Sequence, residues 1–376
     1  MRSEASRVHG CDTQGMTASD RYARQIALPG FGEQGQERLS RARVLVIGAG
    51  GLGSPVIHAL AAAGVGALGI VDDDAVELSN LHRQVIHGTL DVGREKVASA
   101  ADAVRALNPD VVVHTYAERL TAANALDLFT EYDLVLDGSD NFPTRYLACD
   151  AAVLRGIPLV WGAVSQYAGQ VGVSWPGDGP SYRDLFPVPA PPGTVLSCAD
   201  GGVLPTVVGV IGSLMATEAL GILTGRGAPL VGRVLVFDAL TMRFREISYA
   251  RSPEATPITG LGDESAPRDA IPTIDARSLA AMDADGITLI DVREPWEVEI
   301  AALPGAVLIP LGTLEEAVGT SLADVDRRTP MVAFCHHGVR SERACDILRA
   351  AGFEASSLAG GIDAWSRTVD ASVARY

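Results

Sequence analysis

Cys335 is a candidate for sulfur chemistry because of the residues on either side of it. It follows the apolar run 331–334, and the loop 336–341 leads from it into a helical pattern. A loop of this size between a strand and a helix turns backbone N–H groups toward the sulfur, where they stabilise a thiolate or a persulfide. Gly338 permits the curvature, and Arg340 adds a positive charge. The segment predicts a reactive, anionic sulfur.

A second group of residues has the pattern of a phosphate site. The apolar run 44–47 leads into a turn that contains Gly48, Gly50, Gly51 and Gly53, and an apolar helical pattern follows. Glycines let the backbone approach a phosphate closely, and a helix N-terminus directs free N–H groups at the anion. Asp72 ends the next strand pattern, where an acid binds ribose hydroxyls. This much is equally consistent with a dinucleotide enzyme.

Charged residues further along the chain help to distinguish an ATP site from an NAD site. Arg83 and Lys96 follow the second strand pattern, and Asp140 and Asn141 follow a later one. A triphosphate needs several fixed cations and a carboxylate for magnesium. Arg83 and Lys96 meet the first need and Asp140 the second. An NAD site requires none of them, so the pattern favours ATP with Mg²⁺.

The order of strand and helix patterns predicts an α/β protein of two domains. Strand-like runs at 44–47, 67–72, 111–117, 133–140 and 158–164 alternate with helical patterns, which indicates a parallel sheet covered on both faces. Residues 251–272 are dense in proline, glycine and charge and are interpreted as a linker. The alternation restarts beyond them and predicts a smaller α/β domain over 273–376. Residues 1–19 are predicted to be a disordered tail.

Five motifs in the first domain resemble those of the MoeB/ThiF adenylyltransferases, relatives of the ubiquitin-activating enzymes. The resemblance covers residues 20–250 and implies a Rossmann-like adenylation domain of the ubiquitin-activating type. It also implies that ATP adenylates the C-terminal glycine of a small ubiquitin-like sulfur-carrier protein. The motifs are RYARQIALPGFG (21–32), GAGGLGSP (48–55), SNLHRQ (79–84), SDNFPTRY (139–146) and SCADGGVL (197–204).

The same resemblance implies roles for single residues. Asp140 would bind Mg²⁺, and Arg24 would reach across a homodimer to the phosphates. Cys198 matches a cysteine proposed in relatives to bond covalently to the carrier, although a merely exposed thiol is an equal alternative. The residues implied to hold ATP are Gly48, Gly50, Gly51, Gly53, Asp72, Ser79, Asn80, Arg83, Lys96 and Asn141.

One departure from that family concerns zinc. Many members hold a structural zinc ion with two Cys-x-x-Cys pairs, and the matching positions here are Ser181, Asp184, Thr256 and Thr259. Hydroxyls and one carboxylate are poor substitutes for four thiolates. We therefore predict that the chain has no zinc site.

The second domain resembles the rhodaneses. The loop after Cys335 has their Cys-x-x-Gly-x-Arg pattern, and residues 291–293 and 358–365 occur in the family's order. The resemblance implies a smaller α/β rhodanese domain that carries a persulfide on Cys335, loaded by a cysteine desulfurase or by thiosulfate. His336 and His337 have no evident third ligand and are interpreted as loop lining. The zinc-free pattern with the fused tail resembles the MoeZ type.

Composition limits the partners. The formal net charge of −16 argues against nucleic acid and anionic membranes. Five cysteines without a pairing pattern indicate a reducing compartment, and the N-terminus lacks the apolar core of a secretory signal, so we expect a cytoplasmic protein. The apolar stretch 201–223 contains Pro205 and Glu218 and is interpreted as a core or subunit-interface helix.

Two other functions remain open from the sequence. An NAD-dependent oxidoreductase would use the same glycine-rich turn, and a non-catalytic carrier-binding scaffold would keep both sites without chemistry. The leading interpretation is a fused adenylyltransferase and sulfurtransferase. The sequence does not identify its carrier or its pathway, and molybdenum cofactor biosynthesis is one of several that use this chemistry.

Overall fold

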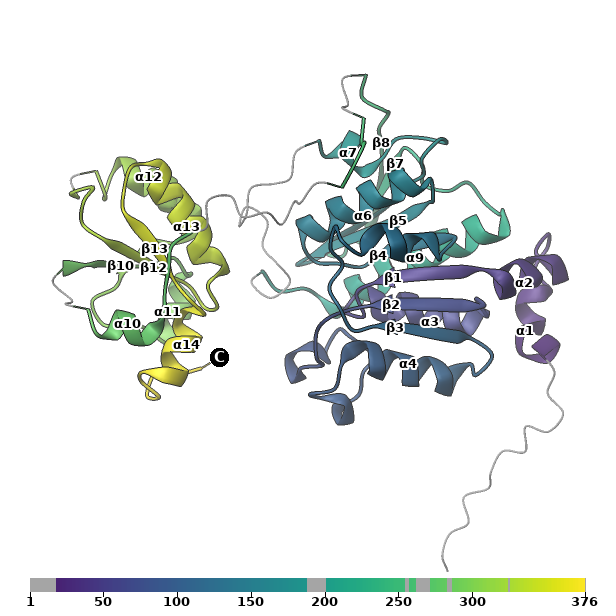
Figure 1. Cartoon of the computed structure of the whole chain (residues 1–376), viewed down its shortest axis with the longest axis horizontal. Helices are drawn as coiled ribbons and strands as arrows, with labels where there is room; N and C mark the ends of the chain where they lie inside the picture. The colour runs from purple at the N-terminus through teal and green to yellow at the C-terminus, as the bar shows by residue number, and fades with distance from the viewer. Residues whose placement is uncertain are drawn as a thin grey trace, which may run out of the picture. The chain divides into compact units, whose positions relative to one another are not determined.

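The computed structural model describes residues 18–187, 201–253, 257–261, 271–282, 286–323 and 325–375. They form two compact units, one with the described residues up to 261 and one with those from 271 onward (Figure 1). Most of the predicted tail 1–19 and of the predicted linker 251–272 lies outside the described residues, although helix α1 (Ala18–Ile26) begins at Ala18.

The first unit is built on one eight-stranded sheet. Its strand order is β3-β2-β1-β4-β5-β6-β7-β8, and the first five of these strands are parallel. The strands are β1 (Arg43–Ile47), β2 (Ala67–Val71), β3 (Val112–Tyr116), β4 (Leu134–Asp137), β5 (Leu159–Ser165), β6 (Ala168–Ser174), β7 (Arg233–Asp238) and β8 (Arg243–Ser248).

The five predicted strands are parallel, as expected, and three further strands that the sequence did not predict extend the sheet in antiparallel pairing. β5 pairs antiparallel with β6, β6 with β7 and β7 with β8. Only Gln166 and Tyr167 separate β5 from β6. A connection that short forms a hairpin, whereas a parallel pair needs a crossover of a dozen or more residues.

Helices cover both faces of this sheet, as predicted (Figure 1). Alternate residues of β1 point to opposite faces, so Val44 and Val46 join one core while Leu45 and Ile47 join the other. On the first face pack α2 (Gly32–Arg41), α3 (Gly53–Ala63), α4 (Lys96–Leu107) and α9 (Pro205–Thr224); on the second pack α5 (Ala125–Thr130), α6 (Phe142–Arg155) and α7 (Tyr182–Leu185).

α9 corresponds to the apolar stretch at 201–223. By length and composition it is the one helix among the described residues that could cross a membrane. It packs against α3, β5 and β6, and Val207, Ile211 and Met215 lie in the core. This packing supports the interpretation as a core helix.

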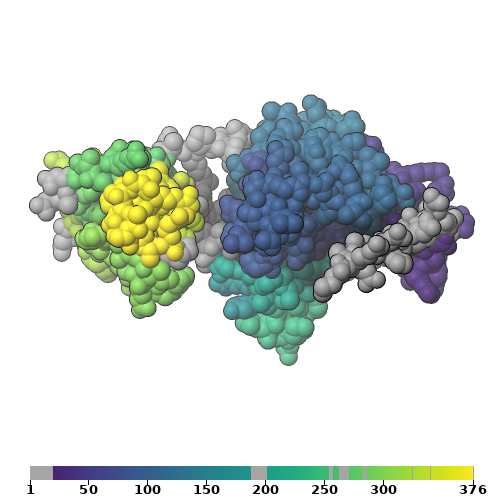
Figure 2. Space-filling model, turned by 90° about the horizontal axis from the view of Figure 1, so that it is seen from below, coloured from purple at the N-terminus to yellow at the C-terminus, as the bar shows by residue number. Residues whose placement is uncertain are grey.

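The second unit contains a smaller, fully parallel sheet of order β11-β10-β12-β13-β9. Its strands are β9 (Thr273–Ile274), β10 (Thr288–Asp291), β11 (Val307–Leu308), β12 (Met331–Phe334) and β13 (Ala355–Leu358). The helices are α10 (Ala276–Ala280), α11 (Pro295–Ile300), α12 (Leu314–Gly319), α13 (Val339–Ala350) and α14 (Gly361–Thr368). α14 packs on α10, and Figure 2 shows the yellow C-terminal residues as one compact surface of this unit.

The order of the large sheet places the first candidate site. β1 lies between β2 and β4. The chain adds β2 and β3 on one side of β1 and then returns to add β4 and β5 on the other, so the strand order changes direction beside β1. Ligands of such sheets bind at the carboxyl ends of the strands where this reversal occurs. The glycine turn, Asp72 and the segment after Asp137 follow the carboxyl ends of these three strands.

Candidate active sites

The glycine turn between β1 and α3 is held by close backbone contacts. A Cβ atom on Gly53 would lie 1.8 Å from the carbonyl oxygen of Gly48, so only glycine fits at this position. Across the turn, the backbone N–H of Ala49 donates to Asp72 Oδ2 at 2.8 Å. The turn and the predicted ribose-binding acid are therefore joined directly.

The buried ammonium of Lys96 lies between the partly buried Asp72 and the exposed Asp74. Its ammonium is 2.6 Å from Asp74 Oδ2 and 3.9 Å from Asp72 Oδ1, and its side chain is 7% exposed. Burial raises the pKa of Asp72, and the Lys96 charge opposes part of that rise. Asp72, Asp73 and Asp74 place carboxylate oxygens within 4.8 Å of one another, a convergence that does not include Asp140.

The SNLHRQ segment brings three predicted residues together. Arg83 Nη1 donates to the carbonyl oxygen of Ser79 at 3.1 Å, and the Asn80 side chain accepts the N–H of Glu77 at 3.2 Å. The stem of Arg83 lies against the glycine turn, since its Cγ would be 3.7 Å from a Cβ on Gly51. Arg83 follows the short 3-10 segment Leu78–Asn80, and its side chain lies beside the turn.

His87 and Gln84 belong to the same site, and the sequence analysis missed both. The buried His87 ring bonds to the Ala49 carbonyl oxygen through Nε2 at 2.9 Å and to Ser99 Oγ through Nδ1 at 2.8 Å. Burial lowers the pKa of His87, which favours the neutral ring. Gln84 is 4% exposed and reaches toward Gly50. Their position within four residues after Arg83 was the available signal.

Asp140 lies on a loop that is held in place by the buried ion pair between Arg145 and Asp137. Arg145 Nε is 3.3 Å from Asp137 Oδ2, and Arg145 Nη2 donates to the Ser139 carbonyl oxygen at 2.7 Å. Asp137 Oδ1 accepts the Ser139 N–H at 2.9 Å. On the other side, Asn141 caps α6 by accepting the N–H of Thr144. Asp140 itself is exposed between these anchors.

The Asp137–Arg145 pair yields a prediction about stability. Arg145→Met leaves the Asp137 carboxylate buried without its partner, so we expect the free energy of unfolding to fall by about 3–5 kcal/mol. The exposed pair of Arg155 with Asp127, 3.9 Å apart, provides the control. Arg155→Met should cost less than about 1 kcal/mol. Urea unfolding monitored by hydrogen exchange of β4 peptides measures both, and equal losses would contradict the expectation.

Other predicted residues of this unit lie elsewhere. Arg24 is exposed in the last turn of α1, and its reach to a partner subunit stays a prediction. Cys198 lies outside the described residues. Of the four zinc-matching positions, Ser181 donates to Asp184 Oδ2 from both its N–H and its Oγ, and Asp184 Oδ1 accepts the Ser252 N–H at 2.9 Å. Asp184 thus caps α7 and ties it to residue 252.

In the second unit, Cys335 follows β12 and its sulfur accepts polar hydrogen bonds although it is buried. The thiol is 1% exposed and borders the apolar core. Its Sγ receives the Gly338 N–H at 3.1 Å and lies 3.6 Å from Ser341 Oγ. Gly338 has φ +110°, a conformation that strongly favours glycine. The predicted turning of loop donors toward the sulfur is therefore present at Gly338.

Arg340 is held in a buried ion pair. Its guanidinium forms a two-pronged, buried pair with Glu297, at 2.6 and 2.7 Å. The other buried arginine, Arg293, is paired with Asp291 at 2.6 Å. The predicted positive charge of Arg340 is therefore compensated by Glu297 within a formally neutral pair, and its role at the sulfur stays a prediction. Glu297 is 43 residues away in sequence and was missed.

The loop that follows Cys335 is hydrogen-bonded to α14, and it begins with two histidines. The N–H groups of Ile362 and Asp363 donate to the carbonyl oxygens of Cys335 and His336, at 2.9 and 3.2 Å. The rings of His336 and His337 stack with centroids 3.9 Å apart. Burial lowers the pKa of His336, so its ring tends to be neutral. This arrangement agrees with a loop-lining role.

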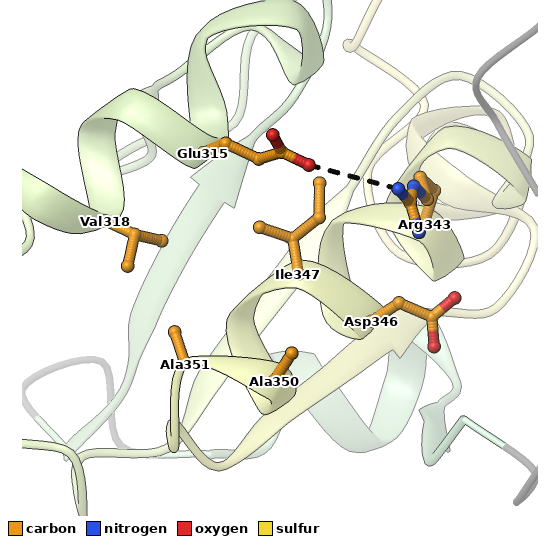
Figure 3. Close-up of a pocket in the computed structure, with 7 residues that line it drawn as sticks. All are labelled: Glu315, Val318, Arg343, Asp346, Ile347, Ala350 and Ala351. Atoms are coloured by element: carbon orange, nitrogen blue, oxygen red, sulfur yellow. Dashed lines mark ion pairs between the residues drawn. The ribbon is translucent and has the colours of Figure 1, made fainter. Parts of the chain in front are cut away.

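A hollow of this unit lies away from the sulfur. It measures about 350 Å³ and lies between α12 and α13, where Glu315 faces Arg343 at 4.0 Å (Figure 3). Val318 and Ile347 contribute apolar walls, and Cys335 is not among the lining residues.

The remaining described cysteines, Cys149 and Cys345, are core residues. Cys149 on α6 and Cys345 on α13 are buried. Burial raises the pKa of Cys149 to about 11 and that of Cys345 to about 12. Both thiols therefore stay protonated and unreactive at neutral pH.

Comparison with known proteins assigns both units. A family model described as the ThiF family matches residues 22–257, and one described as a rhodanese-like domain matches residues 275–368. The chain belongs to the ThiF family. The "Probable adenylyltransferase/sulfurtransferase MoeZ" of Mycobacterium tuberculosis is 46% identical over 373 residues, 95% of each chain. This ThiF-family chain is an adenylyltransferase and sulfurtransferase, which confirms the resemblance and argues against an NAD-dependent oxidoreductase.

Two further relatives bear on the first unit. The sulfur carrier protein adenylyltransferase of Thermus thermophilus is 54% identical over 257 residues, covering 67% of this chain and 94% of the relative. The crystal structure of E. coli MccB with MccA-N7isoASN is similar with a TM-score of 0.57 at 21% identity, over 64% of this chain and 75% of that one. The structural likeness shows the fold alone.

Proposed function

We propose that this ThiF-family enzyme adenylates the C-terminal glycine of a small ubiquitin-like sulfur carrier and then transfers sulfur to it from a persulfide on Cys335. The observation that carries the proposal is the presence of two different centres in one chain. The first unit has a glycine turn bordered by Arg83 and Lys96, and the second has a sulfur that accepts the Gly338 N–H at 3.1 Å.

The residues of the first centre suit a magnesium nucleotide. The turn at Gly48–Gly53 has no room for a side chain at Gly53, Arg83 lies beside it, and the exposed Asp140 follows a strand that adjoins β1. Mg²⁺ bound through Asp140 would neutralise phosphate charge. Arg83 would orient the phosphates, Asp72 the ribose, and Lys96 would exchange part of its pairing with Asp74 for a phosphate oxygen.

The first step activates a carboxylate. An oxygen of the carrier's terminal carboxylate attacks the α-phosphorus of ATP, and pyrophosphate leaves with the electron pair of the broken P–O bond. The product is an acyl-adenylate, in which the carbonyl carbon has become electrophilic. The fixed cations act on the negative charge that develops on phosphorus oxygens.

The second step delivers sulfur. The Cys335 thiolate takes a sulfur atom from thiosulfate, releasing sulfite, or from a cysteine desulfurase persulfide. The terminal sulfur of the Cys335 persulfide attacks the acyl carbon and AMP leaves. Cys198 thiolate then attacks Cys335 Sγ in the acyl disulfide, which frees the thiocarboxylate and leaves a Cys198–Cys335 disulfide. An external dithiol reduces that disulfide and restores both thiols.

The remaining features of the proposal concern assembly and setting. Residues 251–272 would act as a linker that lets the rhodanese loop visit the adenylate. Arg24 would serve the phosphates of the partner subunit in a homodimer, and no zinc would be needed near α7. A persulfide chemistry with unpaired cysteines suits the cytoplasm.

ATP–pyrophosphate exchange tests the proposal. Purified chain, ATP, Mg²⁺ and radiolabelled pyrophosphate are mixed with candidate carriers, each paired with a version that lacks its terminal glycine. Exchange that depends on one intact carrier is the expected result. Absence of exchange with every carrier, together with absence of cyanide-dependent thiosulfate cleavage, would contradict it.

A further inference from the structure

A pair of buried hydroxyls lies next to the Cys335 sulfur. Ser341 in the first turn of α13 is 0% exposed and Ser357 on β13 is 1% exposed. Their oxygens are 2.8 Å apart. Ser341 Oγ also lies 2.8 Å from the carbonyl oxygen of Gly338 and 3.6 Å from Cys335 Sγ. One hydroxyl therefore has three polar neighbours within hydrogen-bond reach.

The number of hydrogens limits what this group can do. A serine hydroxyl has one hydrogen to donate and two lone pairs to accept with. The Gly338 carbonyl oxygen can only accept, and so can a Cys335 thiolate. The single hydrogen of Ser341 can therefore serve the carbonyl or the sulfur, but not both fully. Ser357 can fill a lone pair of Ser341 Oγ in either case.

The charges around the loop increase the importance of this hydrogen. Arg340 is paired with Glu297 and Arg293 with Asp291, so the two buried arginines are compensated. A negative charge on Cys335 then depends on dipoles. The described dipoles in contact with Sγ are the Gly338 N–H and the Ser341 hydroxyl. A hydrogen bond to a charged group is stronger than one between neutral groups.

We propose that Ser341 is the side-chain donor of the sulfur site: its hydrogen bonds to the Gly338 carbonyl oxygen while Cys335 is a neutral thiol and turns to Sγ when the thiol is deprotonated. Ser357 is a positioning residue that keeps Ser341 Oγ within reach of both the Gly338 carbonyl oxygen and Cys335 Sγ. The donor serves Cys335 both as the thiolate that attacks a sulfur donor and as the thiolate that departs when cyanide takes the terminal sulfur. The inference rests on the proposed persulfide role of Cys335.

The pH dependence of Cys335 alkylation measures the effect. Full-length protein is treated with iodoacetamide between pH 5 and pH 10, and the Cys335 peptide is quantified by mass spectrometry. Ser341→Ala should raise the midpoint by about one pH unit, which is about tenfold less thiolate below both midpoints. Ser357→Ala should raise it less, because Ser341 keeps its hydrogen and loses only its partner.

Ser366→Ala is the matched control. Ser366 is a buried serine of the same unit whose hydroxyl donates to the Val373 carbonyl oxygen at 2.8 Å, away from the loop. It should leave the midpoint unchanged. A wild-type midpoint in Ser341→Ala, or an equal shift in Ser366→Ala, would overturn the proposal. Should Ser341→Ala fail to fold, an unshifted Ser357→Ala would overturn it instead. Failure of wild-type Cys335 to accept sulfur from both thiosulfate and a cysteine desulfurase persulfide would refute the proposed function, and the alkylation profile would still decide the role of Ser341.

Discussion

Cys335→Ala is expected to reduce sulfur transfer to the carrier by at least about 10³-fold while carrier adenylation continues at the wild-type rate. The variant removes the atom that forms the bond to sulfur and leaves the glycine turn of the other unit untouched. Sulfur transfer is measured as thiocarboxylate formed in the presence of thiosulfate, and adenylation as ATP–pyrophosphate exchange. Both assays use the same carrier.

Cys345→Ala separates this chemistry from the loss of any buried thiol. Cys345 lies on α13 in the core of the same unit, and its raised pKa keeps it protonated. We expect it to retain both activities. Sulfur transfer at the wild-type rate by Cys335→Ala would show that the persulfide forms elsewhere and would refute the role of the loop.

Asp140→Ala is expected to lower ATP–pyrophosphate exchange by at least about 100-fold, a loss of about 2.7 kcal/mol in transition-state stabilisation. Asp140 is exposed, and the Asp137–Arg145 pair and the Asn141 cap hold the loop without its side chain. The fold should therefore survive. Thiosulfate cleavage by Cys335 should continue unchanged.

The control for that variant is Asp127→Ala. Asp127 is an exposed acid on α5, 94% exposed, in a long-range pair with Arg155. Its loss should change neither activity. If Asp140→Ala lost thiosulfate cleavage as well, misfolding would be the cause. If it kept full exchange, the converging Asp72, Asp73 and Asp74 carboxylates would be the better candidates for the metal.

Local patterns predicted the parts of the fold that depend on short segments. The strands at 44–47 and 331–334 are followed in the structure by the glycine turn and by Cys335, because each strand–turn–helix unit is specified by neighbouring residues. The antiparallel strands β6 to β8 were not predicted. β6 pairs with β5 through the short hairpin at Gln166 and Tyr167, and β8 pairs with β7 through the turn at 239–242. β7 returns to β6 only after α7 and α9, so that pairing depends on the completed fold.

Contacts between distant segments could not be predicted in the same way. The sequence suggested a positive charge on Arg340. In the structure that charge is compensated by the carboxylate of Glu297, which lies on another helix, α11. Ser341 meets Ser357 from a different strand, and His87 meets the glycine turn through Ala49. Each is a pairing in space that depends on the completed sheet. The residue types indicated which side chains could take part in chemistry. Only the fold showed which of them are already hydrogen-bonded or ion-paired.

Intact-mass analysis of the carrier tests the central claim most directly. The full-length protein, ATP, Mg²⁺, thiosulfate and a dithiol are incubated with the carrier that supports pyrophosphate exchange. Replacement of one carboxylate oxygen by sulfur should increase the carrier mass by about 16 units, and only when ATP and Cys335 are both present. A carrier that becomes adenylated but never gains this mass, with wild-type protein and a loaded Cys335 persulfide, would contradict cooperation between the two centres.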